Sequence, residues 1–208
     1  FPKIQNNRMQ LLLRMPVISK KVRQMICQEV VKAFGGELYE VIIGGAAFNQ
    51  EVESFLKRIE FPYTVGYGAT ECAPIICYRD WKTFVQGSCG QEAYHMQVKI
   101  ASSDPARVPG EILAKGLNTM LGYYKNDEAT RDTLDSEGWY HTGDLGTMDA
   151  DGNVFINGRL KNMLLGPNGQ NIYPEEIEDK LNSMAMVVES VVVQRDTKLV
   201  GLVYPDYD

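Results

Sequence analysis

The 208-residue sequence has no apolar run that approaches the length of about 20 residues needed to span a bilayer. Basic residues are fewer than acidic ones, 21 against 27, and the net charge of -6 argues against a nucleic-acid binder with a basic face. The four cysteines form no tightly spaced pair, so a disulfide scaffold is not expected. The chain also starts at Phe1 and lacks a signal-peptide pattern.

Several common catalytic and phosphate-binding motifs are also missing. The sequence has no Gly-Lys pair, no GxGxxG and no GxSxG, which excludes a Walker loop, a dinucleotide fingerprint and a nucleophile elbow. The run from Asp149 to Asn153 begins like a calcium loop. However, Val154 stands where glycine is needed and Leu160 where glutamate is needed, so a turn is predicted. Four further residues are of metal-ligating types, but their spacing matches no zinc pattern: Cys72, Cys77, Cys89 and His95. The three cysteines are expected to be buried or idle thiols instead.

Hydrophobic periodicity predicts an α/β layer in the first part of the chain. We expect a helix at 10–15, then a second helix that follows Ser19 as N-cap and ends at Gly35 and Gly36. The β-branched run 41–43 predicts a parallel strand buried on both faces. A helix capped by Asn49 and a strand at 63–66 follow, and the alternation indicates a βαβ-type layer. The apolar face of that helix comprises Val52, Phe55, Leu56 and Ile59.

The pattern changes after about Trp81. Short strand patterns at 97–101, 110–114 and 154–156 alternate with turn residues and predict a small β-barrel or sheet. Beyond Gly158 comes a polar glycine loop. Pro174 then opens a helix whose apolar face holds Ile177, Leu181 and Met184, and strands are expected at 187–193 and 199–204.

The segment from Gly66 to Glu71 directly follows a predicted strand and combines several ligand-binding residue types. Its glycines allow a ligand close to the backbone, and Tyr67 offers an aromatic face to a base. Thr70 offers a hydroxyl, and Glu71 an acceptor for a hard cation such as Mg²⁺. By itself the segment is more simply explained as a tight turn with a surface acid.

Two later segments carry similar chemistry. Between Gly138 and Gly146, Asp144 lies between glycines and can accept two hydrogen bonds from a ribose diol, although a hairpin with a satisfied Asp is the simpler interpretation. Between Asn157 and Asn162, Arg159 can hold a ribose or a phosphate, whereas such basic residues usually lie on a solvated face.

Together and in this order, these segments resemble the adenylate-forming superfamily, which includes acyl-CoA synthetases, luciferases and peptide-synthetase adenylation domains. The matches are to its YGxTE, TGD, GRxK and upstream GGA segments: Tyr67 to Glu71, Tyr140 to Asp144, Gly158 to Lys161, and Gly44 to Ala46. Gly169 to Asn171 and Pro174 to Glu178 match the superfamily's residues on the C-terminal side of the GRxK segment. The run from Met120 to Asn126 looks most like the long-chain fatty acid CoA ligases.

The resemblance implies a fold class and a division into three parts. Residues 1–78 would form an α/β part of a large domain, and residues 79–160 its β-rich, barrel-like subdomain. Residues 161–208 would begin a small α+β domain after a hinge. The superfamily's phosphate loop and its terminal catalytic lysine are both absent from these residues. We therefore expect the chain to be an inactive piece of a larger ligase.

The resemblance also implies an activity with ATP, Mg²⁺ and coenzyme A as cofactors. Members join a carboxylate, here a fatty acid of medium to long chain, to AMP and then transfer the acyl group to the thiol of coenzyme A. Acyl-AMP ligases and peptide-synthetase adenylation domains, which load a carrier protein, are alternatives, as is a non-catalytic nucleotide-binding module. Because the sequence gives no nucleic-acid or transmembrane signal, a cytoplasmic protein is expected. Peripheral membrane contact and a homodimer through uncovered faces stay open.

The implied site residues divide by role. Thr70 would bind the α-phosphate, Glu71 the Mg²⁺, and Lys161 would be the hinge about which the small domain rotates; these three form the predicted catalytic set. Asn162 stands where many members carry an acid. The residues implied to bind nucleotide or coenzyme A are Gly44, Gly45, Ala46, Tyr67, Gly68, Thr70, Asp144, Arg159 and Gly169, the last in a loop that would line the pantetheine tunnel.

Overall fold

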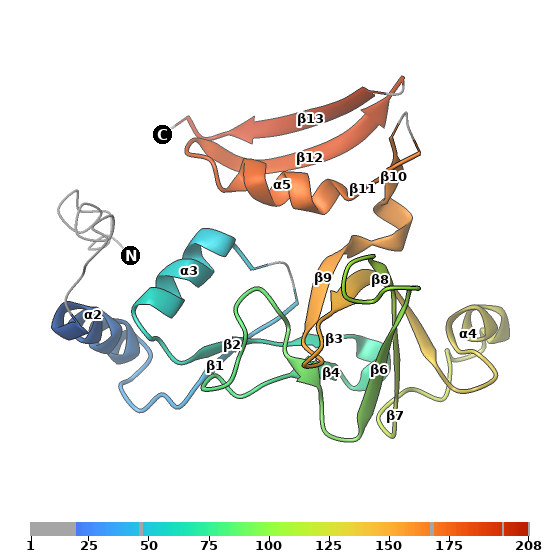
Figure 1. Ribbon diagram of the computed structural model, residues 1–208, viewed down its shortest axis with the longest axis horizontal. Coiled ribbons are helices and arrows are strands. Elements are labelled where there is room, and N and C mark those ends of the chain that lie inside the picture. The colour runs from blue at the N-terminus through green and yellow to red at the C-terminus, as the bar shows by residue number, and fades with distance from the viewer. Residues whose placement is uncertain (1–19, 46–47, 167–168, 197, 208) are drawn as a thin grey trace.

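The computed structural model describes residues 20–45, 48–166, 169–196 and 198–207. The helix expected at 10–15, the cap at Ser19 and the candidate site residue Ala46 lie outside these ranges. In Figure 1 the described elements form an N-terminal α/β part, a central β-rich part and a C-terminal part that lies above both. The boundaries after residues 78 and 160 stay a prediction.

The N-terminal part contains α2 (Lys20–Ala33), β1 (Val41–Ile43), α3 (Gln50–Arg58) and β2 (Tyr63–Val65). Strands β1 and β2 pair in parallel, and α3 connects them as the pattern predicted. The side chain of Asn49 accepts hydrogen bonds from the backbone of Glu51 and Val52 and so caps α3. A hydrophobic cluster built on Ile59, Phe61, Tyr63 and Phe84 packs these elements together.

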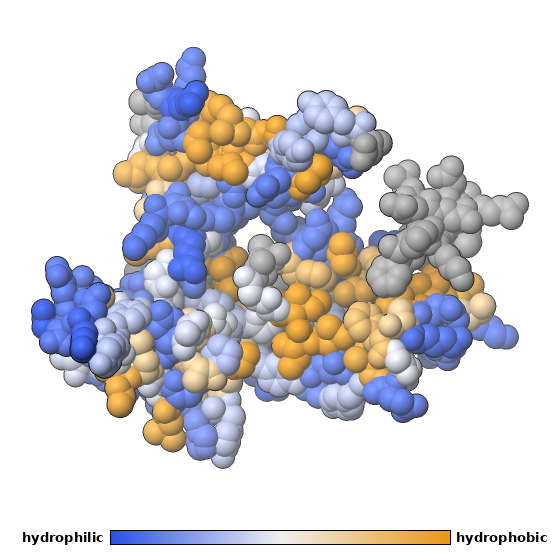
Figure 2. Space-filling view, turned by 180° about the vertical axis from the view of Figure 1, so that it is seen from behind, coloured by the Kyte–Doolittle hydropathy of each residue, from blue (hydrophilic) through white to orange (hydrophobic). Residues whose placement is uncertain are grey.

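One prediction for this part is wrong. The run 41–43 was expected to be buried on both faces, but 54% of Ile42 is exposed. Its sheet has two strands among the described residues, and only one face of it packs on the cluster. Figure 2 shows hydrophobic surface over this part of the molecule, and the large exposed side chains of its elements are Met25, Phe34, Tyr39, Ile42 and Val52.

The central part consists of two antiparallel sheets. The smaller has the order β3 (Tyr67–Gly68), β4 (Ile75–Tyr78), β5 (Gln91–Glu92), and the 3₁₀ turn η1 (Thr70–Cys72) connects β3 to β4. The larger has the order β6 (Met96–Ala101), β7 (Gly110–Gly116), β8 (Tyr140–Met148), β9 (Val154–Arg159), with α4 (Asp127–Thr133) between β7 and β8. Their shared core confirms that the thiols of Cys72, Cys77 and Cys89 are buried.

The C-terminal part begins at the 3₁₀ turn η2 (Leu160–Asn162) and continues through β10 (Leu164–Leu165), β11 (Asn171–Ile172) and α5 (Pro174–Asn182). It ends in a hairpin of β12 (Val187–Arg195) and β13 (Lys198–Pro205), and α5 lies between this hairpin and the rest of the molecule (Figure 1). Met184 does not lie on the apolar face of α5 as predicted, because the helix ends at Asn182 and leaves Met184 59% exposed.

Two negative findings hold for the part of the chain that the structure describes. No helix there is long and apolar enough to cross a membrane. No group of three or more His, Cys, Asp or Glu side chains is placed to hold a metal ion. The run from Asp149 to Asn153 is the predicted turn, in which the Asp149 carboxylate accepts hydrogen bonds from Asp151 and Asn153.

Candidate functional site

The loop between β3 and β4 presents the first predicted motif. Gly68 is required here by the fold, because a Cβ at this position would overlap the carbonyl oxygen of Pro74. The chain can therefore turn tightly into η1, which ends at Ala73 in the left-handed region (φ 53°). Thr70 and Glu71 are the first two residues of that turn, and Thr70 is exposed.

Glu71 is fixed by two tyrosines, Tyr123 from the segment between β7 and α4 and Tyr140 from the start of β8. The hydroxyl of Tyr123 donates to Oε1 of Glu71 at 2.7 Å, and the Tyr140 hydroxyl adds a second hydrogen bond. Partial burial alone would raise the pKa of Glu71, but these hydrogen bonds and the charge of Arg159 outweigh it and lower the pKa. Glu71 is therefore held ionised and oriented.

The Asp144 carboxylate is the centre of the second cluster. The Tyr67 hydroxyl donates to its Oδ2 at 2.5 Å, and Nε of Arg159 lies 2.8 Å from its Oδ1. Asp144 and Arg159 are register partners on β8 and β9, which explains their ion pair. Burial and the bond to Asp144 raise the pKa of the Tyr67 phenol, so it stays a donor.

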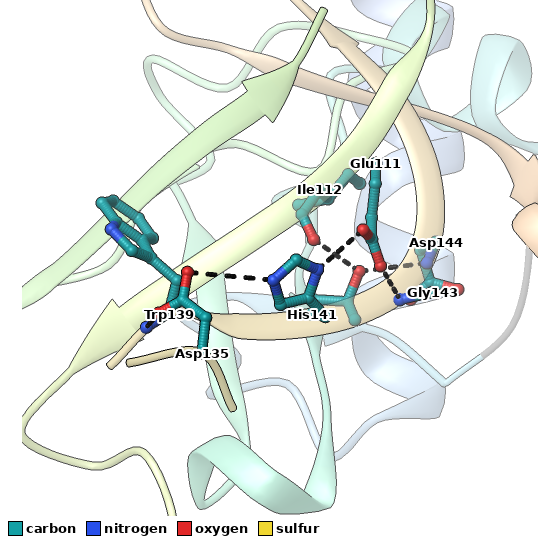
Figure 3. A network of polar contacts seen from close by, with 8 residues as sticks. Glu111, Ile112, Asp135, Trp139, His141, Gly143 and Asp144 are labelled. Carbon is teal, nitrogen blue, oxygen red and sulfur yellow. Dashed lines mark hydrogen bonds and ion pairs between the residues drawn. The ribbon is translucent and has the colours of Figure 1, made fainter. Parts of the chain in front are cut away.

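The backbone around Asp144 is held by a network of hydrogen bonds between β7 and β8, shown in Figure 3. Glu111 accepts from the backbone nitrogen of Gly143 at 3.1 Å and lies 2.9 Å from Nδ1 of His141. The Thr142 hydroxyl donates to the carbonyl of Ile112 at 2.7 Å and accepts from the backbone nitrogen of Asp144 at 3.0 Å. The simpler interpretation also fits the structure, since Asp144 lies on β8 of the β8–β9 hairpin and its carboxylate is bonded by Tyr67 and Arg159.

The third motif leads from the sheet into the C-terminal part. Lys161 is exposed on η2, and the next side chain, Asn162, donates to Oε1 of Glu175 at 2.6 Å. Asn157 donates to Oε1 of Glu176 at 3.0 Å, so two asparagines bind the first turn of α5 from either side of Lys161. A Cβ at Gly158 would come within 2.6 Å of Oε2 of Glu175, which indicates how closely α5 approaches β9.

The predicted residues are thus brought together only in part. Tyr67, Glu71, Asp144 and Arg159 form one polar cluster, linked through Asp144 and through the charge of Arg159 on Glu71. Gly44 and Gly45 are exposed directly after β1, and Gly169 lies in the turn between β10 and β11 with φ 75°. The predictions missed Tyr123, Tyr140 as a partner of Glu71, and Glu111. No spacing rule connects these residues to their partners.

This cluster suits a ligand with a diol and a phosphate. An ionised carboxylate has about four lone-pair sites, so Asp144 can accept from a diol while it stays bonded to Tyr67 and Arg159. Glu71 offers a single carboxylate as a metal ligand. A single carboxylate suits Mg²⁺, which is commonly bound by one or two carboxylates together with substrate phosphates.

Comparison with known proteins agrees with this chemistry. A family model described as "AMP-binding enzyme" matches residues 4–124. A 2-succinylbenzoate–CoA ligase of Bacillus cytotoxicus is 32% identical, and the match covers 84% of this chain and 38% of that protein. Long-chain-fatty-acid–CoA ligase 1 of Saccharomyces cerevisiae is 30% identical over 88% of this chain and 27% of its own length.

A solved structure is similar in fold as well as in sequence. It is the O-succinylbenzoate coenzyme A synthetase MenE of Bacillus subtilis in complex with ATP and magnesium ion, with a TM-score of 0.70 and 26% identity. The match covers 84% of this chain and 39% of that one. This chain therefore spans less than two fifths of the length of each of these relatives.

Proposed function

The chain belongs to the family of AMP-binding enzymes, within the adenylate-forming superfamily, and we propose that it serves an acid–thiol ligase that works through an acyl-adenylate. In the first step a carboxylate oxygen bonds to the α-phosphorus of ATP and pyrophosphate leaves. In the second step a thiol sulfur, that of coenzyme A, bonds to the acyl carbon and AMP leaves. This chain's residues contribute to binding, orientation and charge stabilisation.

The observation that carries the proposal is the pair of contacts on Asp144. Its carboxylate is fixed from one side by Tyr67 and from the other by Arg159, and only 13% of the Asp144 side chain is exposed. A carboxylate held in this way can bind both ribose hydroxyls without first being ordered. The Tyr67 ring beside it would contact the adenine, together with the backbone of Gly44 and Gly45.

Glu71 and Thr70 would act at the phosphates. Glu71 is ionised and oriented by Tyr123, so it would hold Mg²⁺, whose charge offsets that of the phosphate oxygens. The exposed hydroxyl of Thr70 would donate to the α-phosphate. Both residues belong to the short turn that Gly68 makes accessible.

Lys161 and Gly169 would serve the second step. Lys161 lies in a three-residue turn between the sheet and the C-terminal part, the kind of position that absorbs a change in backbone angles. Rotation there would bring the loop of Gly169 to the pantetheine arm of coenzyme A. The acyl substrate we propose is a fatty acid, because the run from Met120 to Asn126 resembles fatty acid CoA ligases.

Calorimetry tests the binding part of the proposal. We expect the 208-residue chain to bind AMP, and Asp144→Asn to weaken binding about tenfold or more, since it removes a charged acceptor. Asp132→Asn, an exposed acid on α4, is the charge-matched control and should bind as the wild type does. Equal affinity of the Asp144 and Asp132 variants would overturn the assignment of Asp144.

A second assay measures pyrophosphate release with ATP, Mg²⁺ and palmitate. We expect no turnover by this chain alone, because it contains neither the phosphate loop nor the terminal lysine of the superfamily. Turnover would contradict that expectation and support catalysis by these residues alone. If AMP does not bind, the non-catalytic nucleotide-binding alternative fails as well.

A further inference from the structure

Strand β8 departs from regular pairing at the position of Asp144. Leu113 of β7 pairs with His141, and Glu111 pairs with Leu145, so the single residue between them on β7 faces three residues on β8. The three are Thr142, Gly143 and Asp144. Such a bulge changes the direction in which the strand presents its side chains, and bulges are common beside active sites. Here the bulge contains the carboxylate of the candidate site.

A bulge leaves backbone donors without ladder partners, and side chains replace those partners here. The nitrogen of Gly143 donates to Oε1 of Glu111, and that of Asp144 donates to the hydroxyl of Thr142. Gly143 adopts φ 69°, in the left-handed region that glycine tolerates. The conformation therefore depends on side-chain acceptors from β7 and from β8 itself.

Glu111 is itself held in place. Its second oxygen, Oε2, lies 2.9 Å from Nδ1 of His141, and the other ring nitrogen of His141 faces Oδ2 of Asp135 at 3.8 Å. Asp135 in turn accepts backbone hydrogen bonds from Trp139 (Figure 3) and from Glu137. The Glu111 side chain is 19% exposed. The Glu111 carboxylate is thus a fixed acceptor.

We propose that Glu111 is a positioning residue for nucleotide binding: its carboxylate holds the bulge of β8 so that Asp144 points to Tyr67, Arg159 and the ribose hydroxyls. This inference rests on the proposed function. Glu111 acts through the Gly143 amide, and its two contacts divide its carboxylate between the bulge and His141.

The contacts of Glu111 predict how its substitutions differ. Glu111→Ala removes the acceptor of the Gly143 amide and of the His141 ring. Glu111→Gln keeps a neutral oxygen acceptor for the Gly143 amide. Its side-chain N–H group can donate to Nδ1 of His141 when the ring proton is on Nε2. Glu111→Gln should therefore keep part of the AMP affinity that Glu111→Ala loses. Glu128→Ala, an exposed acid on α4, serves as the control.

The experiment compares two ligands, AMP and 2′,3′-dideoxy-AMP, by calorimetry on the 208-residue chain. The ratio of their affinities measures how well Asp144 meets the ribose hydroxyls. In Glu111→Ala we expect this ratio to fall about tenfold, since one fixed charged acceptor is lost. The affinity for the dideoxy nucleotide should stay within about twofold of wild type. The affinity ratio of Glu111→Gln should lie between those of the wild type and Glu111→Ala, and the ratio of Glu128→Ala should match that of the wild type.

Each outcome decides something. A wild type that binds AMP no better than the dideoxy nucleotide, or binds neither, overturns the proposed function. A wild type that discriminates while both Glu111 variants keep its ratio overturns the positioning role. An equal loss for both ligands in the Glu111 variants also overturns it, because that result marks a general structural role. If Glu111→Ala does not fold, Glu111→Gln alone decides by its ratio and by faster amide hydrogen exchange at Gly143.

Discussion

At the scale of single residues, the candidate site consists of carboxylates that are already hydrogen-bonded. Asp144 is bonded by Tyr67 and Arg159, and Glu71 by Tyr123. The tyrosines remain protonated donors, because burial raises the pKa of Tyr67 and the bond to Glu71 raises that of Tyr123. Each acid is thus oriented before a ligand binds, which reduces the entropy cost of binding.

This arrangement predicts a role for Tyr123. In Tyr123→Phe, Oε1 of Glu71 loses its donor, so we expect the affinity for Mg²⁺ and ATP together to fall about threefold to tenfold. AMP binding without Mg²⁺ should change little. The matched control is Tyr124→Phe, because Tyr124 is 87% exposed. Calorimetry with and without Mg²⁺ measures both, and an equal effect of the two variants would contradict the prediction.

The sequence motifs predicted the residue types of this site better than their partners. Tyr67, Asp144 and Arg159 were each selected from their own segment, yet the bond from the Tyr67 hydroxyl to Asp144 joins residues 77 positions apart. Tyr67 was expected to offer its ring, and its hydroxyl is equally engaged. Such contacts depend on how β3, β8 and β9 pack, which no local pattern encodes.

At the scale of elements, helix predictions were confirmed where caps and periodicity agree. The cap of Asn49 on α3 and the proline at the start of α5 lie as predicted, and Gly35 and Gly36 adopt positive φ after α2. The element that differs most is β8. A hairpin with a satisfied Asp was one interpretation of its sequence, but nothing there indicated the bulge that side chains of β7 and β8 support.

The turn between β8 and β9 should make stability depend on pH. Partial burial alone would raise the pKa of Asp149, but hydrogen bonds from Asn153 and Asp151 outweigh it and hold the pKa below its ordinary value of 3.8. A lowered pKa stabilises the fold above 3.8, and this contribution is lost as the pH falls through the folded-state value.

Asp149→Asn removes that contribution. We expect the variant to lose up to about 1 kcal/mol of unfolding free energy at neutral pH, since the turn is largely solvated. The difference from wild type should shrink as the pH falls below 3.8. Urea unfolding from strongly acidic to neutral pH measures it. Asp151→Asn is the charge-matched control in the same turn, and a pH dependence equal to that of Asp149→Asn would contradict the assignment.

At the scale of the whole molecule, the C-terminal part meets the rest through a polar interface beside η2. Across this interface Asn157 of β9 donates to Glu176, and Asn49 lies 3.4 Å from the hydroxyl of Ser183. Within the C-terminal part, Asn162 of η2 donates to Glu175. Oδ1 of Asn157 and Oε2 of Glu175 are buried there without a hydrogen-bond partner among the described residues. An interface with such unsatisfied atoms is a weak one, which agrees with the proposed rotation at this joint about Lys161.

Asn162→Asp tests this joint. The substitution places a second carboxylate against Glu175, and we expect the repulsion to release α5 from η2 at a cost of about 1 kcal/mol. Amide hydrogen exchange in α5 should become severalfold faster. Gln28→Glu, which adds the same charge on the exposed side of α2, should leave α5 unchanged. Unchanged exchange in both variants would show that the asparagine contact does not hold the joint.

The order of helices and strands could be predicted from the sequence in outline, but their contacts could not. The change from helical to strand patterns after Trp81 agrees with the observed elements. The exposure of Ile42 was not foreseen, because a β-branched run does not reveal whether a second layer covers it. Similarly, nothing in the run from Pro174 to Glu178 shows that its acids meet two asparagines.

The bulge in β8 also constrains how this segment can change in length during evolution. Side chains alternate between the two faces of a strand, and the bulge contributes two more residues than its partner strand. A deletion of one residue here would move every later side chain of β8 to the opposite face of the sheet. A deletion of two would restore regular pairing and keep the core in phase, but it would remove the outward turn that carries Asp144. Relatives shortened by two residues at this point should therefore keep the scaffold while losing the contacts of Asp144 with Tyr67 and Arg159.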